Sequence, residues 1–160
     1  MNTFWSDIVV FSGGSSVGER DLVIDALRQH GEVIFHSIAI KPGKPTVFGR
    51  IGQAPVLGLS KYPTSCLSNA HLFLVPLLRA IASLPKWNPR TVTLPLARRI
   101  TSGVGRVQFY MVRVIDGRAE PAFKASGDIT SMAHADGYVT VPARTELVEA
   151  GTDVVVTLYD

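Results

Sequence analysis

The feature that most constrains the fold is a short apolar run followed at once by a glycine-rich segment and an amphipathic stretch. Ile8–Phe11 is apolar throughout, which is typical of a strand buried on both faces of a parallel sheet. Residues 12–18 are rich in glycine and serine, and residues 19–30 then carry their apolar side chains at helical spacing. Because Val33–Ile38 is a second apolar run, the order predicts a right-handed strand–helix–strand unit.

The next elements continue the α/β pattern. Gly31 is expected to end the first helix as the glycine that follows its last residue. Residues 55–59 predict a third buried strand, and residues 64–84 predict a long, mostly apolar helix. Pro76 is expected to kink that helix, because proline removes a backbone donor and clashes with the preceding turn.

This half contains fewer strands than a sheet usually has. We count three, against about five in a typical sheet, and the first begins almost at the start of the sequence. An open sheet with that edge unpaired would expose an apolar strand. We therefore expect the chain to be part of something larger or to need a partner at this edge.

The hydrophobic period changes after a linker at residues 84–90. Four segments of β type follow, separated by turn residues, at 91–97, 107–115, 137–141 and 154–159. Asp116 and Gly117 form a hairpin signal with a weak return strand after it. The fold class is thus α/β then all-β, with domains at residues 1–88 and 89–160, the second a small antiparallel barrel or sandwich.

Composition narrows the function classes. The 160 residues are 46% apolar with a net charge of +3, which excludes a disordered chain and is too weakly basic to indicate nucleic acid. A single cysteine, Cys66, excludes an internal disulfide framework, and the scattered histidines lack zinc-ligand spacing. Residues 70–84 are too interrupted to span a bilayer. We expect a soluble, cytoplasmic protein with no membrane or nucleic-acid partner.

Three segments stand where ligands bind in open α/β sheets, at the carboxyl ends of strands. The first, at residues 12–18, lets the backbone approach an anion near a helix start, or it is simply a tight connection. The second, at residues 41–45, is stiffened by two prolines and carries two lysine ammonium groups that suit an oxyanion. Alternatively, it is a solvated basic turn. The third, at residues 60–65, has the same position, or is a helix cap. The candidate side chains are Gly13, Gly14, Ser15, Gly18, Lys41, Lys44, Pro45, Lys61 and Ser65.

Asp21 adds a carboxylate to this set. It could hold Mg²⁺, which prefers one or two carboxylates together with substrate phosphates. Alternatively, it complements the dipole of the first helix. Taken together, the glycines, lysines and carboxylate predict one crevice for an anionic, phosphorylated ligand with a divalent metal.

The same residues resemble those of a known family. Residues 7–21, 39–49 and 58–67 are similar to three loops of the MoeA/gephyrin family of molybdopterin molybdenumtransferases, and residues 135–139 and 151–154 are similar to its C-terminal β domain. The resemblance implies a partial molybdopterin-binding, MogA-like three-layer α/β domain followed by a small C-terminal β-barrel domain. It covers the C-terminal portion of such proteins.

The resemblance also implies an activity. Family members insert molybdate, or tungstate, into adenylylated molybdopterin with Mg²⁺-dependent release of AMP. By motif position, Lys41, Lys44 and Pro45 are expected at the oxyanion site and Asp21 at Mg²⁺ or in catalysis. The glycine loop is expected to approach the pterin phosphate, and Ser131 corresponds to a serine near molybdate. Lys61 departs from the family, which has a glycine there.

Partners follow from the same resemblance. Family members are dimers, and we expect this chain to form a homodimer or to need the N-terminal domains of the family. On its own we expect low or no activity. An alternative function is a non-catalytic module that binds pterin or an oxyanion, or serves as a scaffold. A generic nucleotide-binding domain is disfavoured, because the chain has neither a P-loop nor G-x-G-x-x-G.

Overall fold

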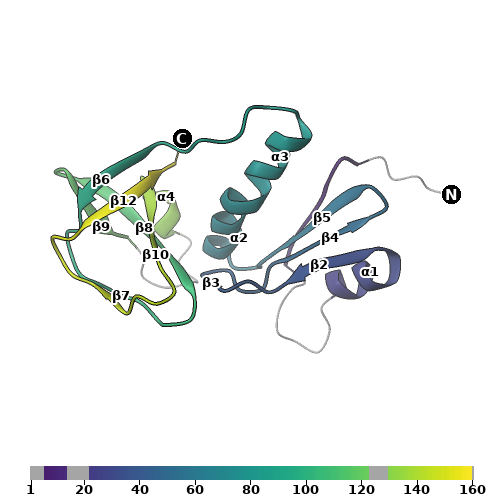
Figure 1. Ribbon diagram of the computed structural model, residues 1–160, viewed down its shortest axis with the longest axis horizontal. Coiled ribbons are helices and arrows are strands. Elements are labelled where there is room, and N and C mark those ends of the chain that lie inside the picture. The colour runs from purple at the N-terminus through teal and green to yellow at the C-terminus, as the bar shows by residue number, and fades with distance from the viewer. Residues whose placement is uncertain (1–5, 14–21, 123–129, 160) are drawn as a thin grey trace. The chain divides into compact units, whose positions relative to one another are not determined.

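The structure is a computed structural model that describes residues 6–13, 22–122 and 130–159, without the side chains of Thr130 and Ser131. The chain divides into two compact units (Figure 1). The first contains residues 1–38 and 43–87, and the second contains residues 39–42 and 88–160. Within the described ranges, no helix has the length and apolar character needed to cross a membrane.

The first unit is built on a four-stranded sheet with the order β1-β5-β4-β2. The strands are β1 (Val9–Ser12), β2 (Glu32–His36), β4 (Val47–Ile51) and β5 (Ala54–Leu59). Pairing is parallel between β1 and β5 and antiparallel in the other two pairs.

The sheet has one strand more than the three that the sequence predicted, and its pairing is mixed rather than purely parallel. The two strands of the predicted strand–helix–strand unit, β1 and β2, are present, and the strands β5 and β4 lie between them in the sheet. The sequence did not indicate strand β4, which is joined to β5 by a tight hairpin turn between Ile51 and Ala54 that contains Gly52 at φ +60°. Strands β1 and β2 still run in the same direction, since two antiparallel steps restore it.

Helices cover both faces of this sheet, which gives three layers. Helix α1 (Leu22–His30) packs Val23, Ile24 and Leu27 against Val47 and Val56. On the opposite face, an aromatic cluster joins Phe35 of β2 to Phe48 and Phe73, with ring centroids 5.7 and 5.9 Å apart. The three-layer arrangement predicted for this half is therefore present in the described residues.

A β-bulge lets β2 serve both layers. Val33 packs with the α1 cluster, whereas Phe35 joins the aromatic cluster on the other face. Two residues of one parity would share a face in a regular strand. The register shifts between Val33 and Phe35, and Ile34, which is 54% exposed, is the extra residue.

The long helix predicted after β5 is three consecutive segments. These are α2 (Pro63–Asn69), a π-helical turn η1 (Ala70–Leu74) and α3 (Val75–Ile81). The N–H of Val75 bonds to the carbonyl of Ala70, five residues back. The sequence predicted a kink at Pro76, and the structure has a widened π-helical turn just before this residue. Proline has no backbone N–H to donate to the regular hydrogen bonds of an α-helix.

Gly31 follows the last residue of α1, as the sequence predicted, and its backbone is not left-handed. Its N–H bonds to the Leu27 carbonyl at 2.8 Å, and its φ is not among the positive values. A Cβ built on Gly31 would lie 2.0 Å from the carbonyl oxygen of Arg50. The glycine is required here by the close approach of β4.

The second unit contains a six-stranded sheet in which β3, β8, β10, β12 and β6 follow one another and β9 pairs with β8. Its bounds are β3 (Ile40–Lys41), β6 (Thr91–Pro95), β8 (Val107–Ile115), β9 (Arg118–Pro121), β10 (Gly137–Val141) and β12 (Asp153–Leu158). A short pair, β7 (Ile100–Thr101) with β11 (Leu147–Val148), and helix α4 (Thr130–Ala133) complete it.

The β character predicted for this half is confirmed, and its hairpin has the expected turn. Asp116 and Gly117 both have positive φ, 49° and 69°, as a two-residue hairpin requires. Residues 39–42 enter this sheet as β3, which the sequence did not indicate. A closed barrel stays a prediction.

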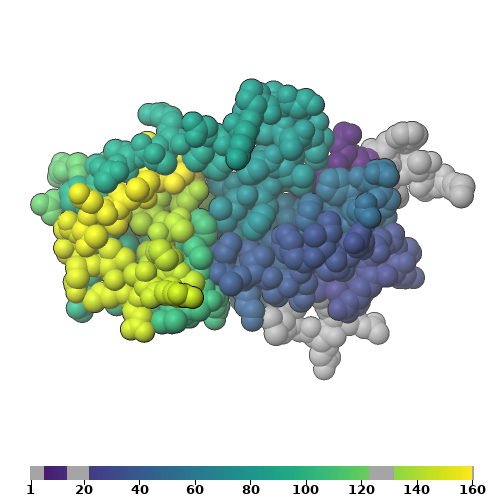
Figure 2. All heavy atoms as spheres, viewed as in Figure 1, coloured from purple at the N-terminus to yellow at the C-terminus, as the bar shows by residue number. Residues whose placement is uncertain are grey.

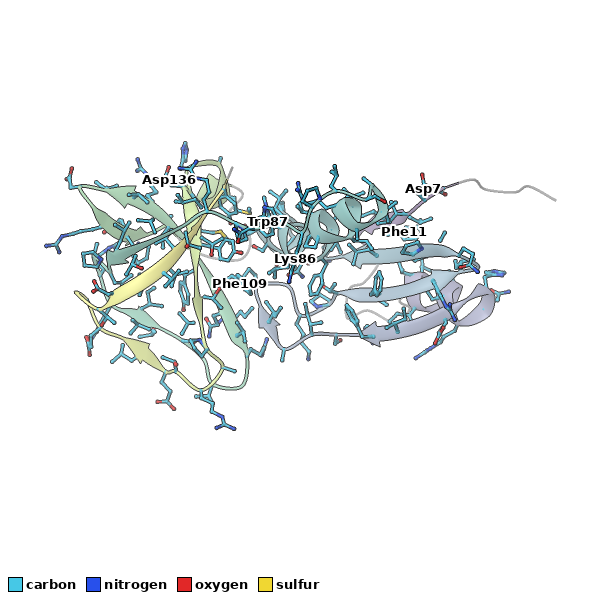
Figure 3. The ribbon with its side chains drawn as sticks, turned by 45° about the horizontal axis from the view of Figure 1, so that its top comes forward. Asp7, Phe11, Lys86, Trp87, Phe109 and Asp136 are labelled. Atoms are coloured by element: carbon cyan, nitrogen blue, oxygen red, sulfur yellow. The ribbon has the colours of Figure 1, made fainter. Side chains whose placement is uncertain are left out.

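Alternation along the strands builds the core of the second unit. In β12, Val154 and Val156 are buried while Val155 is 56% exposed, and the yellow C-terminal segment reaches the surface in Figure 2. Phe109, labelled in Figure 3, packs its ring 5.3 Å from that of Tyr138. The buried residues of the core cluster are Leu96, Ile100, Val112, Ala119, Val139, Val141, Val154 and Val156.

Candidate functional site

The glycine loop and the segment after β5 meet at the carboxyl ends of two parallel strands. Ser12 pairs with Leu59, and the N–H of Gly13 bonds to the Leu59 carbonyl at 3.1 Å. Gly13 has φ +87°, and a Cβ built on it would lie 3.7 Å from the Cβ of Lys61. The structure therefore brings together Gly13 and Lys61, which the sequence predicted for one site.

These two strands diverge to opposite faces of the sheet. The chain after β1 continues to α1 on one face, and the chain after β5 continues through α2 to η1, which covers the other face. Neighbouring parallel strands that diverge in this way form a topological switch point, where ligands bind in open α/β sheets. Gly13 and Lys61 lie at that point.

The lysine loop of the first unit lies at the same end of the sheet. His36, the last residue of β2, pairs with Val47, and Val47 pairs with Gly58 near the end of β5. The loop between β2 and β4 therefore leaves the sheet about 10 Å or less from the end of β5, since adjacent strands are about 4.8 Å apart. Lys44, in this loop, is exposed.

Backbone hydrogen bonds hold the loop around Lys44. The Lys44 carbonyl accepts one bond from the N–H of Ile38 at 3.0 Å and another from the N–H of Thr46 at 2.9 Å. Pro45 follows Lys44 and is half-buried. The exposed ammonium group of Lys44 thus extends from a backbone that hydrogen bonds from Ile38 and Thr46 hold in place. This agrees with the stiff loop that the sequence predicted.

A buried asparagine that the sequence did not indicate fastens this loop to α2. The Asn69 Nδ2 atom donates to the Gly43 carbonyl at 2.8 Å and to Thr46 Oγ1 at 2.6 Å. Thr46 Oγ1 in turn donates to the Gly43 carbonyl at 2.9 Å. Helix α2 also carries Thr64, Ser65 and Ser68, so nothing in the sequence distinguishes Asn69 as the residue that contacts the loop.

Lys61, where the resemblance predicts a glycine, does not have a positive φ and therefore adopts its backbone conformation without strain. Its Nζ lies 5.6 Å from the centroid of the Tyr62 ring, within range of a cation–π contact. Ser65 is only 3% exposed, so its hydroxyl lies below the surface that carries Lys61. Lys61 therefore adds a cation to this edge of the sheet.

The remaining expected site residues lie outside the described residues or in the second unit. Gly14, Ser15, Gly18 and Asp21 lie outside the described residues. Lys41 is exposed and belongs to β3 of the second unit, and Ser131 lies in α4 of that unit. Among the described side chains, no three His, Cys, Asp or Glu residues are grouped as metal ligands. The roles of these remaining site residues stay predictions.

Two protein-family models match the two units. Residues 2–80 match the family described as "Probable molybdopterin binding domain", and residues 93–159 match the "MoeA C-terminal region (domain IV)". The first match covers the α/β part of the chain, and the second covers the β part.

Individual proteins show the same similarity. The chain is 40% identical over 147 residues to a molybdopterin biosynthesis protein of Methanocaldococcus jannaschii, a match that covers 91% of this chain and 35% of the relative. It is 32% identical to the molybdopterin molybdenumtransferase of Synechococcus elongatus over 94% of this chain and 39% of that enzyme. The chain thus spans little more than a third of these relatives.

Solved structures of molybdopterin and molybdenum cofactor biosynthesis proteins are also similar to this chain. The crystal structure of a molybdopterin biosynthesis MoeA protein from Pyrococcus horikoshii superposes with a TM-score of 0.81 at 41% identity. The match covers 96% of this chain and 37% of that one. A molybdenum cofactor biosynthesis protein from Pyrococcus furiosus gives a TM-score of 0.76 at 28% identity over 96% of this chain and 49% of its own.

Proposed function

Because the chain belongs to the MoeA/gephyrin family of molybdopterin molybdenumtransferases, we propose that it contributes the oxyanion-binding edge of such an enzyme. The proposed reaction is insertion of molybdate or tungstate into adenylylated molybdopterin, with Mg²⁺-dependent release of AMP. The observation that carries the proposal is the position of Lys61, Gly13 and the Lys44 loop at one end of the sheet.

The described residues supply cations on a stiff frame. A tetrahedral oxyanion is bound by charge-assisted hydrogen bonds, which are stronger than bonds between neutral groups. The Lys44 backbone is fixed by two hydrogen bonds to its carbonyl, so less conformational entropy is lost when its ammonium group binds. Gly13 leaves room beside Lys61 for the ligand to approach the backbone.

Mg²⁺ would be held by Asp21 together with phosphate oxygens of the substrate, a donor set that Mg²⁺ accepts. The described residues alone provide no cluster of acidic side chains for it. When bound, the metal would neutralise the charge on the phosphoanhydride as AMP leaves. The proposed part of Lys41 and Ser131, in the second unit, is to bind the oxyanion.

The proposal is tested by calorimetric titration of the chain with sodium molybdate in buffer without Mg²⁺. Replacing Lys44 or Lys61 by alanine is expected to weaken binding about tenfold or more, because each change removes a charge-assisted hydrogen bond. The matched control is Lys86→Ala, which removes the same charge from an exposed residue after α3 and should leave binding unchanged. Equal affinity of all three variants and the parent chain would refute the proposed site.

Catalysis is proposed to need more than this chain. Strand β1 has no second neighbour among the described strands, and Val10 and Phe11 are each 41% exposed on it. We propose that a second copy of the chain or the N-terminal domains of the family complete the enzyme. AMP release from adenylylated molybdopterin, molybdate and Mg²⁺ should therefore be low with the chain alone, and robust turnover would contradict this.

A binding module without chemistry is the second candidate function, and Lys61 is the observation that favours it. The side chain occupies space beside Gly13 that a family glycine would leave open. In the completed enzyme, Lys61→Gly separates the two candidates. A rise in AMP release would favour a binding module derived from a transferase, whereas a fall would favour a transferase that uses the additional cation.

A further inference from the structure

The Oδ1 atom of Asn69 does not contribute to stability. The side chain is fully buried, and its Oδ1 atom has no hydrogen-bond partner among the described residues. A buried acceptor without a partner lowers the free energy of unfolding. A leucine has the same branched heavy-atom skeleton and would lack this unpaired atom, while the Gly43 carbonyl would keep its bond from Thr46 Oγ1.

What the amide does achieve is attachment of the backbone on both sides of Lys44. Its two donated bonds reach the Gly43 carbonyl, just before Lys44, and Thr46 Oγ1, two residues after it. Gly43 is adapted to this contact, because it has φ +110° and a Cβ built on it would lie 2.2 Å from Asn69 Nδ2. The Lys44 loop thus follows any movement of Asn69.

Asn69 is also linked to Lys61 through one helix. Helix α2 begins at Pro63, two residues after Lys61, and ends at Asn69. Its seven residues extend about 10 Å at 1.5 Å per residue. The helix therefore connects the backbone that carries one cation to the loop that carries the other.

We propose that Asn69 is a positioning residue that holds Lys44 in place relative to Lys61 through α2. The inference rests on the proposed function, since it assigns the purpose of the spacing between the two cations. Asn69 itself does not contact the oxyanion in this proposal. It acts through Lys44, whose loop it attaches to α2.

The first test measures the loop without any ligand, by amide hydrogen exchange of the full chain. The reporters are the N–H groups of Ile38 and Thr46, which bond to the Lys44 carbonyl. In Asn69→Leu their exchange should be at least about tenfold faster, the effect of losing about 1.4 kcal/mol of hydrogen bonding. The N–H of Gly31, bonded to Leu27 in α1, should not change.

Matched variants separate loop attachment from general damage. Ser68→Ala removes a neighbouring buried hydroxyl that bonds within α2 to the Thr64 carbonyl, and it should leave the reporters unchanged. Should Asn69→Leu fail to fold, Thr46→Val removes the other partner, and Thr46→Ser should restore slow exchange. Unchanged exchange in Asn69→Leu, or in Thr46→Val if the first does not fold, overturns the proposal.

The second test is a double-mutant cycle on molybdate binding. Lys44→Ala should weaken binding in the parent chain about tenfold but by less than about twofold in the Asn69→Leu background, whereas Lys61→Ala should weaken it equally in both. Additive effects of Asn69→Leu and Lys44→Ala would overturn the positioning role. If Lys44→Ala has no effect in either background, the proposed function fails, while the exchange experiment still decides the role of Asn69.

Discussion

The backbone of Gly13 lies directly against the side chain of Lys61, with 3.7 Å between a Cβ built on the glycine and the Cβ of the lysine. The parallel pairing of β1 with β5 produces this contact, because it aligns Ser12 with Leu59 at the ends of both strands. Forty-eight positions of sequence separate the two residues. The contact is therefore a property of the sheet, and it can be altered at either residue.

Replacing Gly13 by alanine should lower the free energy of unfolding by about 1–2 kcal/mol, because the residue has a left-handed backbone at φ +87°. The new methyl group would meet Lys61 at an ordinary contact distance, so strain rather than collision causes the loss. Gly52→Ala is the control, since Gly52 has φ +60° in the β4–β5 turn and open space around it. Urea unfolding should give similar losses, and only Gly13→Ala should weaken molybdate binding.

Gly31→Ala should cost more than either of these changes, about 3 kcal/mol, although its backbone is not left-handed. A methyl group there would lie 2.0 Å from the carbonyl oxygen of Arg50. That atom is part of β4 and cannot move without disturbing the sheet. Urea unfolding measures the loss, and a value no greater than that of Gly52→Ala would show that α1 shifts freely over the sheet.

Deletion of Ile34 should be tolerated, with a change in the free energy of unfolding below about 1 kcal/mol. Without this extra residue, Val33 and Phe35 become consecutive and alternate naturally to the two faces that they already occupy. Deletion of Thr140 is the contrasting variant, because it places two core residues, Val139 and Val141, on opposite faces. Circular dichroism and urea unfolding should show a folded first variant and a severely destabilised second one.

Stability should depend on the protonation of His71, which lies in η1. Burial lowers the pKa of its imidazole below the ordinary value of 6.5. The unfolded chain then binds a proton at a higher pH than the folded chain does. The contribution of the neutral His71 side chain to the free energy of unfolding is therefore fully present above pH 6.5. It decreases as the pH falls from 6.5 toward the lower pKa of the folded state.

The measurement is the urea midpoint of the parent chain and of His71→Gln from about pH 7.5 to about pH 5.5. The difference between the two proteins isolates His71 from the other titrating groups. The parent chain should lose stability relative to the variant as the pH falls, with a slope of at most about 1.4 kcal/mol per pH unit for one proton. A difference that is flat or of opposite sign would contradict burial of the neutral imidazole.

Much of the fold could be predicted from hydrophobic period and turn residues. The bounds 107–115 and 137–141 agree with β8 and β10, because alternation and the Asp116–Gly117 turn specify them locally. Strand β4 was missed because Gly49 interrupts its apolar pattern. That glycine is needed by the neighbouring strand, since a Cβ on it would lie 2.2 Å from the Glu32 carbonyl oxygen.

The candidate site could be predicted only as a set of loops. The rule that ligands lie at the carboxyl ends of strands placed Gly13, Lys44 and Lys61 at one end of the sheet, and the register of β1, β5, β4 and β2 agrees. Asn69 could not be found in the same way. Its role depends on a contact across 23 to 26 positions of sequence, to Thr46 and Gly43, and nothing local signals it.

The strand order also bears on the order in which the strands pair during folding. The β4–β5 hairpin joins residues as close as Ile51 and Ala54, whereas β1 must bring Val9 to Val56. Loop closure makes the longer-range pairing slower. Loop closure therefore favours docking of β1 after the hairpin has formed. Gly13 reaches Lys61 only through the pairing of β1 with β5, so affinity for an oxyanion would report whether β1 has docked.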